Sequence, residues 1–117
     1  MTGLLTAGEL PPGFSYPEPF LRVVRLGLTN LEPWQVLDGH LLRRHRQGVG
    51  TRYPDRRLVV FARRGDNDDL ACWDLDRGPG RVSVIHDFAA PGWEQRADLP
   101  GFDAWLRRAV EDLLAFE

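Results

Sequence analysis

The most continuous apolar run in the chain extends from Leu58 to Ala62 and has the length of a strand. A run without polar positions is typical of a central strand that is covered on both faces. Two further strands are expected at 70–75 and 81–88, because sequences rich in Asp, Asn, Gly and Pro separate them from each other and from the first. Three consecutive strands with short connections predict an antiparallel meander.

Helical spacing of apolar residues appears on both sides of this region. The clearest helix begins near Phe102, where apolar residues recur at i, i+3, i+4, i+7, i+8 and i+11. A short amphipathic helix is expected from Pro19 to Gly27, since proline suits a first turn and glycine can close a helix. Asp38 can cap another helix that ends at Gly48. The expected fold is therefore α+β, with a central antiparallel sheet flanked by N-terminal and C-terminal helices.

Three stretches show no periodicity. Residues 1–16 are rich in Gly, Pro and small side chains and are expected to form an irregular N-terminal arm, lying against the surface or disordered at its tip. Loops are expected at 48–55 and at 89–100. Because no repeat or linker interrupts the chain, residues 1–117 are expected to form a single domain.

Composition agrees with one globular domain, since the 117 residues are 43% hydrophobic and 27% charged. Cys72 is the only cysteine, which excludes an internal disulfide and fits a reducing compartment. The sequence has no signal peptide pattern and no apolar run of membrane-spanning length, so we expect a cytoplasmic protein without membrane contact. All 15 basic residues are arginine, which we interpret as the codon bias of a GC-rich, bacterial genome. The net charge of −2 does not favour nucleic acid as a partner.

Carboxylates crowd two turns, and divalent metal binding is the alternative that they raise. The residues are Asp66, Asp68, Asp69, Asp74 and Asp76. A calcium loop continues with ligands at alternate positions and ends in a bidentate Glu, whereas Leu70 and Ala71 stand where ligands should continue. A solvated turn surface is favoured, and no metal or cofactor is expected.

The spacing of the histidines and of the one cysteine does not match a known catalytic or zinc-binding pattern. His40 and His45 are five residues apart, unlike the i,i+4 pair of a zinc helix. His86 and Asp87 are adjacent on an expected strand and so point to opposite faces. Cys72 lies in the middle of a strand without local positive charge, which favours a buried, unreactive thiol over a nucleophile activated by His86.

Four tryptophans divide into two groups. Trp73 and Trp105 occupy core-facing positions of the expected strand and helix. Trp34 and Trp93 lie beside loops, where tryptophan serves either as a lid over the core or as an interface anchor.

Arginines are concentrated just before the acidic turn. They are Arg43, Arg44, Arg46, Arg52, Arg56, Arg57, Arg63 and Arg64. A solvated face is the simpler interpretation, and a landing site for an acidic partner is the alternative.

Short motifs follow one another in order over residues 17–115. They are Pro33-Trp34 with Leu37 and Gly39, Tyr53-Pro54-x-Arg56, Leu58-Val-Val-Phe-Ala-Arg63, Asp66-Asn-Asp-Asp-Leu-Ala-Cys72, Arg81-Val-x-Val-Ile-His-Asp87, Pro91-Gly-Trp-Glu94 and Phe102-x-x-Trp-Leu106. As an ordered set they resemble the SUKH superfamily of Smi/Knr-type domains. The resemblance implies an α+β binding domain without catalytic residues; many bacterial members are immunity proteins that neutralise a toxin, and fungal relatives are scaffolds.

The resulting hypothesis is a non-catalytic immunity protein whose partner is a basic toxin domain. Its predicted binding residues present negative charge and an aromatic anchor. They are Asp66, Asp68, Asp69, Trp93 and Glu94. Two alternatives stay open: a scaffold or regulatory module without a toxin partner, and a small hydrolase that uses Cys72 with His86 or an aspartate-held metal. The sequence does not specify the oligomeric state.

Overall fold

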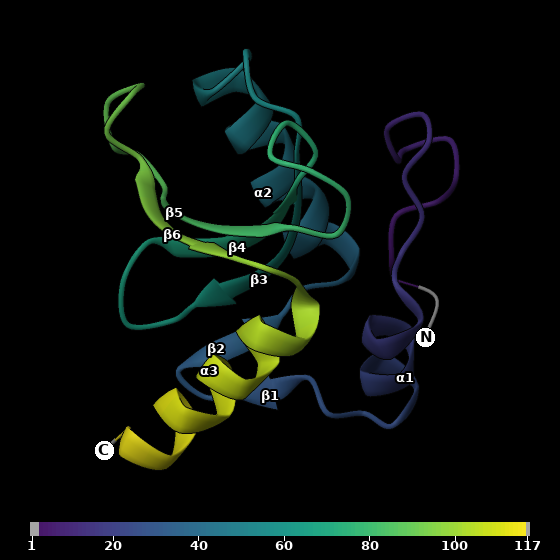
Figure 1. Cartoon of the computed structure of the whole chain (residues 1–117), viewed down its shortest axis with the longest axis vertical. Coiled ribbons are helices and arrows are strands. Elements are labelled where there is room, and N and C mark those ends of the chain that lie inside the picture. The colour runs from purple at the N-terminus through teal and green to yellow at the C-terminus, as the bar shows by residue number, and fades with distance from the viewer. Residues whose placement is uncertain (1–2, 117) are drawn as a thin grey trace.

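The computed structural model describes residues 3–116 and contains one six-stranded antiparallel sheet. The strands pair in chain order: β1 (Asn30–Leu31), β2 (Trp34–Val36), β3 (Leu58–Arg64), β4 (Asp69–Asp74), β5 (Val82–His86) and β6 (Gln95–Leu99). Three helices accompany them: α1 (Glu18–Arg25), α2 (Gly39–Arg52) and α3 (Phe102–Ala115) (Figure 1). The predicted α+β meander with helices toward both ends of the chain is confirmed.

The sheet is covered on both faces, as the apolar run in β3 predicted. Val59 and Phe61 belong to a core cluster that includes residues of α1 and α3, whereas Val60 belongs to a second cluster that includes residues of α2. Successive side chains of a strand point to opposite faces, so one apolar run contributes to both clusters.

Aromatic side chains dominate the core beneath α1 and α3. Phe61 and Trp73 lie with ring centroids 4.3 Å apart, and Trp105 meets Phe61 edge to face at 4.9 Å. Trp34 is 1% exposed, and its indole N–H donates to Asp112 Oδ2 at 2.8 Å. Trp73 and Trp105 are core residues as predicted, and Trp34 covers the core instead of anchoring an interface.

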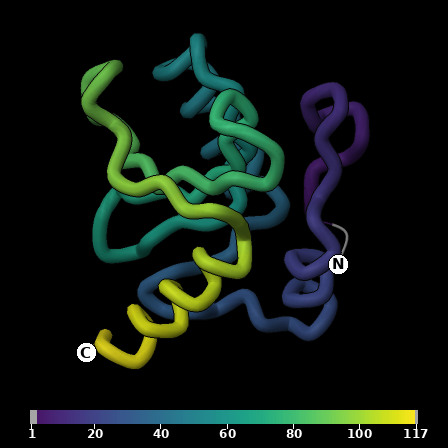
Figure 2. The backbone as a smooth tube through the Cα atoms, viewed as in Figure 1, coloured from purple at the N-terminus to yellow at the C-terminus, as the bar shows by residue number. Residues whose placement is uncertain are grey.

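The N-terminal arm is irregular over residues 3–16, and Met1 and Thr2 lie outside the described residues. It runs alongside the rest of the chain, as the purple segment of Figure 2 shows. Leu5 is 6% exposed, Phe14 lies 5.3 Å from Trp73, and Tyr16 stacks on Phe20 at 5.2 Å. The described part of the arm therefore contributes to the core.

Two expected loops were wrong in part. Helix α2 continues through Gly48 to Arg52, because Val49 is buried and Arg52 pairs with Asp87, the residue that follows β5. The stretch 89–100 contains β6, which pairs with β5 and alternates half-buried with exposed residues. Asp38 precedes α2 as predicted, but its side chain makes no capping hydrogen bond.

Within residues 3–116, no helix has the length and apolar character needed to cross a membrane.

Candidate functional site

The β3–β4 turn and the β5–β6 loop project from the same end of the sheet. The register fixes this, because Asp69 at the start of β4 pairs with His86 at the end of β5. Both connections lie on the left of Figure 1. The predicted binding residues are therefore gathered at one end of the molecule.

Residues 88–93, here called the aromatic loop, expose two large rings. Trp93 is 82% exposed and Phe88 is 66% exposed. Ala90 and Pro91 between them are exposed as well. Large apolar side chains grouped on a surface are a feature of interaction sites.

The first half of this loop is held by α2 and the residue that follows it. Arg52 donates to both carboxylate oxygens of Asp87, at 2.7 and 2.6 Å, and the Asp87 side chain is only 2% exposed. Asp87 Oδ1 also accepts the backbone N–H of Phe88 at 2.9 Å. The Tyr53 hydroxyl donates to the carbonyl of Ala89 at 2.8 Å. These bonds hold the backbone of Phe88 and Ala89 in place.

The second half is held by Glu94. Its side chain is 8% exposed, pairs with Arg56 Nη1 at 2.9 Å, and accepts the backbone N–H of Gly92 at 2.6 Å. Burial pushes the pKa of Glu94 upward, but backbone hydrogen bonds and Arg56 outweigh it and lower that pKa. The predicted binding residue Glu94 thus points inward and positions its neighbour Trp93.

Phe88 has a backbone conformation that a bulky side chain rarely adopts, with φ at 68°. The guanidinium carbon of Arg52 lies 4.0 Å from the centroid of the Phe88 ring, a cation–π contact. Strained residues persist only where the surroundings enforce them, and they are concentrated at functional sites. Arg52 supplies both restraints on Phe88, because it pairs with Asp87 directly before the loop and its guanidinium packs against the Phe88 ring.

The predicted binding residues Asp66, Asp68 and Asp69 differ in whether a neighbouring group compensates their negative charge. Asp66 pairs with Arg64 at 2.7 Å, and that hydrogen bond lowers the pKa of Asp66. Asp69 Oδ1 lies 3.0 Å from His86 Nδ1. Asp68 is exposed, and its carboxylate makes no hydrogen bond within residues 3–116. Of the three, Asp68 presents the least compensated charge.

The residues considered for catalysis are not brought together. Cys72 is fully buried, burial raises the pKa of its thiol, and its cross-strand partner on β5 is Ser83. The ring of His86 faces Asp69 and not Cys72. Among the described residues, no group of three or more His, Cys, Asp or Glu side chains is arranged to hold a metal ion.

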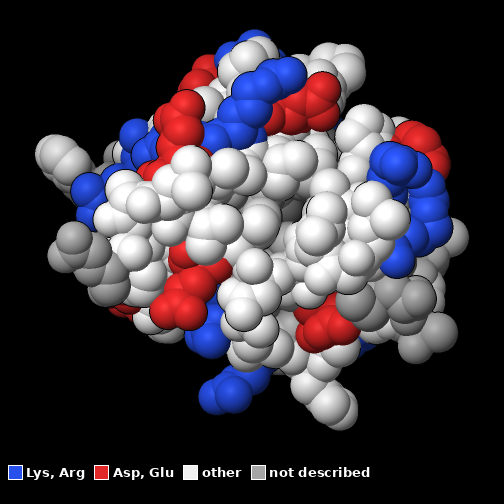
Figure 3. All heavy atoms as spheres, turned by 90° about the horizontal axis from the view of Figure 1, so that it is seen from below, with Lys and Arg blue, Asp and Glu red and all other residues white. Residues whose placement is uncertain are grey.

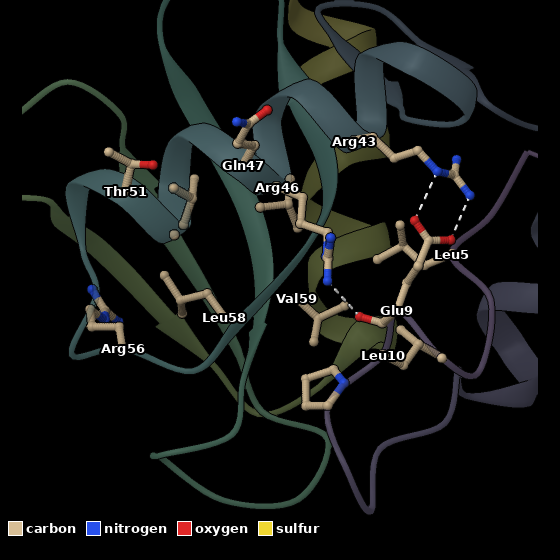
Figure 4. A pocket seen from close by; sticks show the side chains of 15 residues that line it. Leu5, Glu9, Leu10, Arg43, Arg46, Gln47, Thr51, Arg56, Leu58 and Val59 are labelled. Atoms are coloured by element: carbon tan, nitrogen blue, oxygen red, sulfur yellow. Dashed lines mark hydrogen bonds and ion pairs between the residues drawn. The ribbon is translucent and has the colours of Figure 1, made fainter.

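A groove of about 730 Å³ lies between the N-terminal arm and α2, and Figure 4 shows the residues that line it. Arg43 spans it with two hydrogen bonds to the Glu9 carboxylate, at 2.9 and 2.8 Å, and these bonds, together with one from the backbone N–H of Thr6, lower the pKa of Glu9 to about 2. Arg46 donates to the carbonyl of Glu9 at 2.9 Å. Two arginines of this groove therefore anchor the arm.

Exposed apolar side chains also occur around α3. On α3 and directly after it they are Val110, Leu113, Leu114 and Phe116, and two more, Leu26 and Leu28, lie in the connection between α1 and β1. Figure 3 views the molecule from the side of α3 and β1 and shows a broad central area without charged residues. Among residues 3–116, no non-glycine residue of this second surface has a positive φ, and the carboxylate of its ion pair, Asp112 with Arg64 at 3.3 Å, is 25% exposed.

Comparisons of the chain with protein-family models, curated proteins and solved structures give no match. The choice of these residues as the candidate site is therefore based on the geometry of this chain alone. The sequence did not indicate Phe88 or the support that it receives from Tyr53, Asp87 and Arg52, and Arg52 was named only as part of the basic stretch. The available signal was Phe88-Ala-Ala-Pro-Gly-Trp93, a turn sequence with an aromatic residue at each end.

Proposed function

We propose that this chain is a non-catalytic protein-binding domain that engages its partner with the aromatic loop and the adjoining β3–β4 turn. The observation that carries the proposal is Trp93, 82% exposed on a loop braced by two ion pairs whose carboxylates are buried. Tryptophan is enriched among residues that dominate binding energy, and a braced loop loses little conformational freedom when it binds.

Negative charge at the Phe88 end of the aromatic loop supports a basic partner, since Asp68 and Asp69 line a small hollow that Phe88 also lines. Asp68 is exposed, Asp66 lies on the same turn, and Asp69 begins β4 directly after it. Together with the resemblance to SUKH domains, this favours an immunity protein that neutralises a basic toxin domain in a bacterial cytoplasm. Complementary charge would speed that association.

A scaffold without a toxin partner is the second candidate. The observation in its favour is the additional apolar surface around α3, where Leu114 is 80% exposed. Two separate surfaces suit a module that joins two proteins.

The test is capture of partners from a lysate of the source cells by the tagged protein, by Trp93→Ala and by Leu114→Ala. We expect one stoichiometric, basic partner that is weakened by more than tenfold in Trp93→Ala, with the melting temperature unchanged because Trp93 packs against little. Leu114→Ala removes a side chain of similar exposure, 80%, from the second surface, so comparison of the two variants shows which surface binds the partner.

Loss of the partner in Leu114→Ala alone would move the binding surface to α3 and favour the scaffold. Equal capture by all three proteins would contradict the assignment of the aromatic loop.

A further inference from the structure

A second hollow, of about 370 Å³, lies between α2 and the aromatic loop. We call it the basic hollow, and its principal lining residues are Leu41, Arg44, His45, Arg52, Arg63 and Phe88. Three of these six side chains are arginines and none is acidic.

Two of the three arginines have no carboxylate partner among residues 3–116. Arg52 is balanced by the buried Asp87. Arg44 is exposed and makes no side-chain hydrogen bond within the described chain, and Arg63 reaches only the neutral amide oxygen of Gln35, at 3.4 Å. The hollow therefore carries positive charge that the described chain does not neutralise.

His45 experiences this charge. Burial is the main cause that lowers its pKa, and among the nearby charges Asp87 opposes this shift while Arg63, Arg52 and Arg44 add to it. A half-buried imidazole surrounded by guanidinium groups marks a place where an anion is favourable.

The basic hollow is continuous with the proposed binding surface. Phe88, His45 and Arg63 line it and also line a small hollow of about 50 Å³ that includes Asp68 and Asp69. Phe88 thus stands between an acidic turn and a basic hollow, so a protein seated on the aromatic loop would cover both.

Resting on the proposed function, we infer that the basic hollow receives a carboxylate side chain of the bound protein. Arg44 and Arg63 would donate charge-assisted hydrogen bonds to that carboxylate, and the Phe88 ring would pack against its apolar stem. The partner surface is then of mixed sign, basic opposite Asp68 and acidic opposite the basic hollow.

The test is an NMR titration of the whole chain with defined probes. One peptide combines Glu and Asp with Phe, a second of equal length replaces the acids with Gln and Asn, and inorganic phosphate at matched ionic strength is the third probe. We expect the acidic peptide to shift the signals of Arg44, His45, Arg63 and Phe88, and the neutral peptide to bind at least tenfold more weakly.

A double variant, Arg44→Glu with Arg63→Glu, should weaken the acidic peptide at least tenfold. Its matched control is Arg107→Glu with Arg108→Glu, two exposed arginines of α3. If the double variant loses its native amide spectrum, Arg44→Glu alone replaces it, since that side chain is exposed.

Equal binding of both peptides, absence of shifts, or phosphate binding as tightly as the acidic peptide would overturn the inference. The captured partner separates this failure from that of the proposed function. A partner released by Trp93→Ala but retained by the double arginine variant would overturn the role of the basic hollow and leave the proposed function standing.

Discussion

At the scale of single residues, Arg56 and Glu94 show how a buried charge fixes a surface residue. Arg56 pairs with Glu94 at 2.9 Å and with Asp74 at 2.7 Å, while both carboxylates are almost fully buried. Removing one partner of such a pair leaves an uncompensated buried charge, which is costly. The position of Trp93 therefore depends on interactions beneath the surface.

The lowered pKa of Glu94 predicts a defined dependence of stability on pH. Because the folded-state pKa lies below the ordinary value of 4.5, the unfolded chain binds more protons between these two values. The stability that Glu94 contributes is fully present above about pH 4.5 and is lost as the pH falls through the folded-state pKa. Urea unfolding between pH 7 and pH 3 should show a shallower decline in Glu94→Gln than in the wild-type protein.

Glu111→Gln provides the comparison, since Glu111 is exposed on α3 and makes no ion pair within residues 3–116. Identical pH profiles for wild type and Glu94→Gln would mean that the buried pair does not contribute in this way.

At the scale of elements, α2 begins at Gly39 and contains two further glycines, Gly48 and Gly50, whose surroundings are opposite. A Cβ atom at Gly48 would lie 2.5 Å from Arg52 Nη2, whereas a Cβ atom at Gly50 would meet nothing within 4 Å. The absence of a side chain at Gly48 allows Arg52 to fold back along the helix toward Asp87. Gly48 is thus part of the support of the aromatic loop.

Alanine at these two positions should change stability in opposite directions. Gly50→Ala should stabilise the protein by about 1 kcal/mol through helix propensity. Gly48→Ala should instead destabilise it by about 1 kcal/mol, because displacement of Arg52 leaves Asp87 poorly compensated and outweighs the same propensity gain. Urea unfolding measures both changes, and hydrogen exchange at the Phe88 amide should accelerate only in Gly48→Ala.

If both substitutions stabilised the protein equally, the placement of Arg52 would not depend on Gly48.

Sequence patterns predicted the elements that bury a continuous or periodic apolar set, such as β3 and α3. They failed for β6, an edge strand whose outward residues Arg96 and Asp98 are charged and whose inward residues are only half-buried. The sequence also predicted that α2 ends at Gly48, because glycine normally stops a helix. In the structure the ion pair of Arg52 with Asp87 outweighs this signal, and the helix continues to Arg52.

The candidate site was predictable only in part. The turn chemistry of Asp66–Asp69 and the loop position of Trp93 follow from local sequence. The pairs Arg56–Glu94 and Arg52–Asp87 join residues that are 38 and 35 positions apart. Both pairs depend on the register of the whole sheet, which local sequence does not specify.

At the scale of the whole molecule, the N-terminal arm acts as part of the second core cluster. Leu5 is 6% exposed and belongs to the same cluster as Leu42 and Val60. Leu5→Ala should lower the free energy of unfolding by about 2–3 kcal/mol, as expected for a buried leucine. Urea unfolding of this variant beside Leu28→Ala, whose side chain is 53% exposed, measures the contribution of the arm.

Leu28→Ala should stay within about 0.5 kcal/mol of the wild-type protein. A Leu5→Ala variant as stable as Leu28→Ala would show that the arm is not an integral part of the core.

The order of the strands, which follows the chain without a crossover, bears on how quickly the protein folds. Each pairing joins consecutive strands, so the loop-closure entropy that opposes the β3–β4, β4–β5 and β5–β6 pairings is small. Contacts that span the chain, such as Trp34 with Asp112 across 78 positions, close the structure from its two ends. The hairpin that carries the aromatic loop can therefore form early, before α3 and the arm have docked.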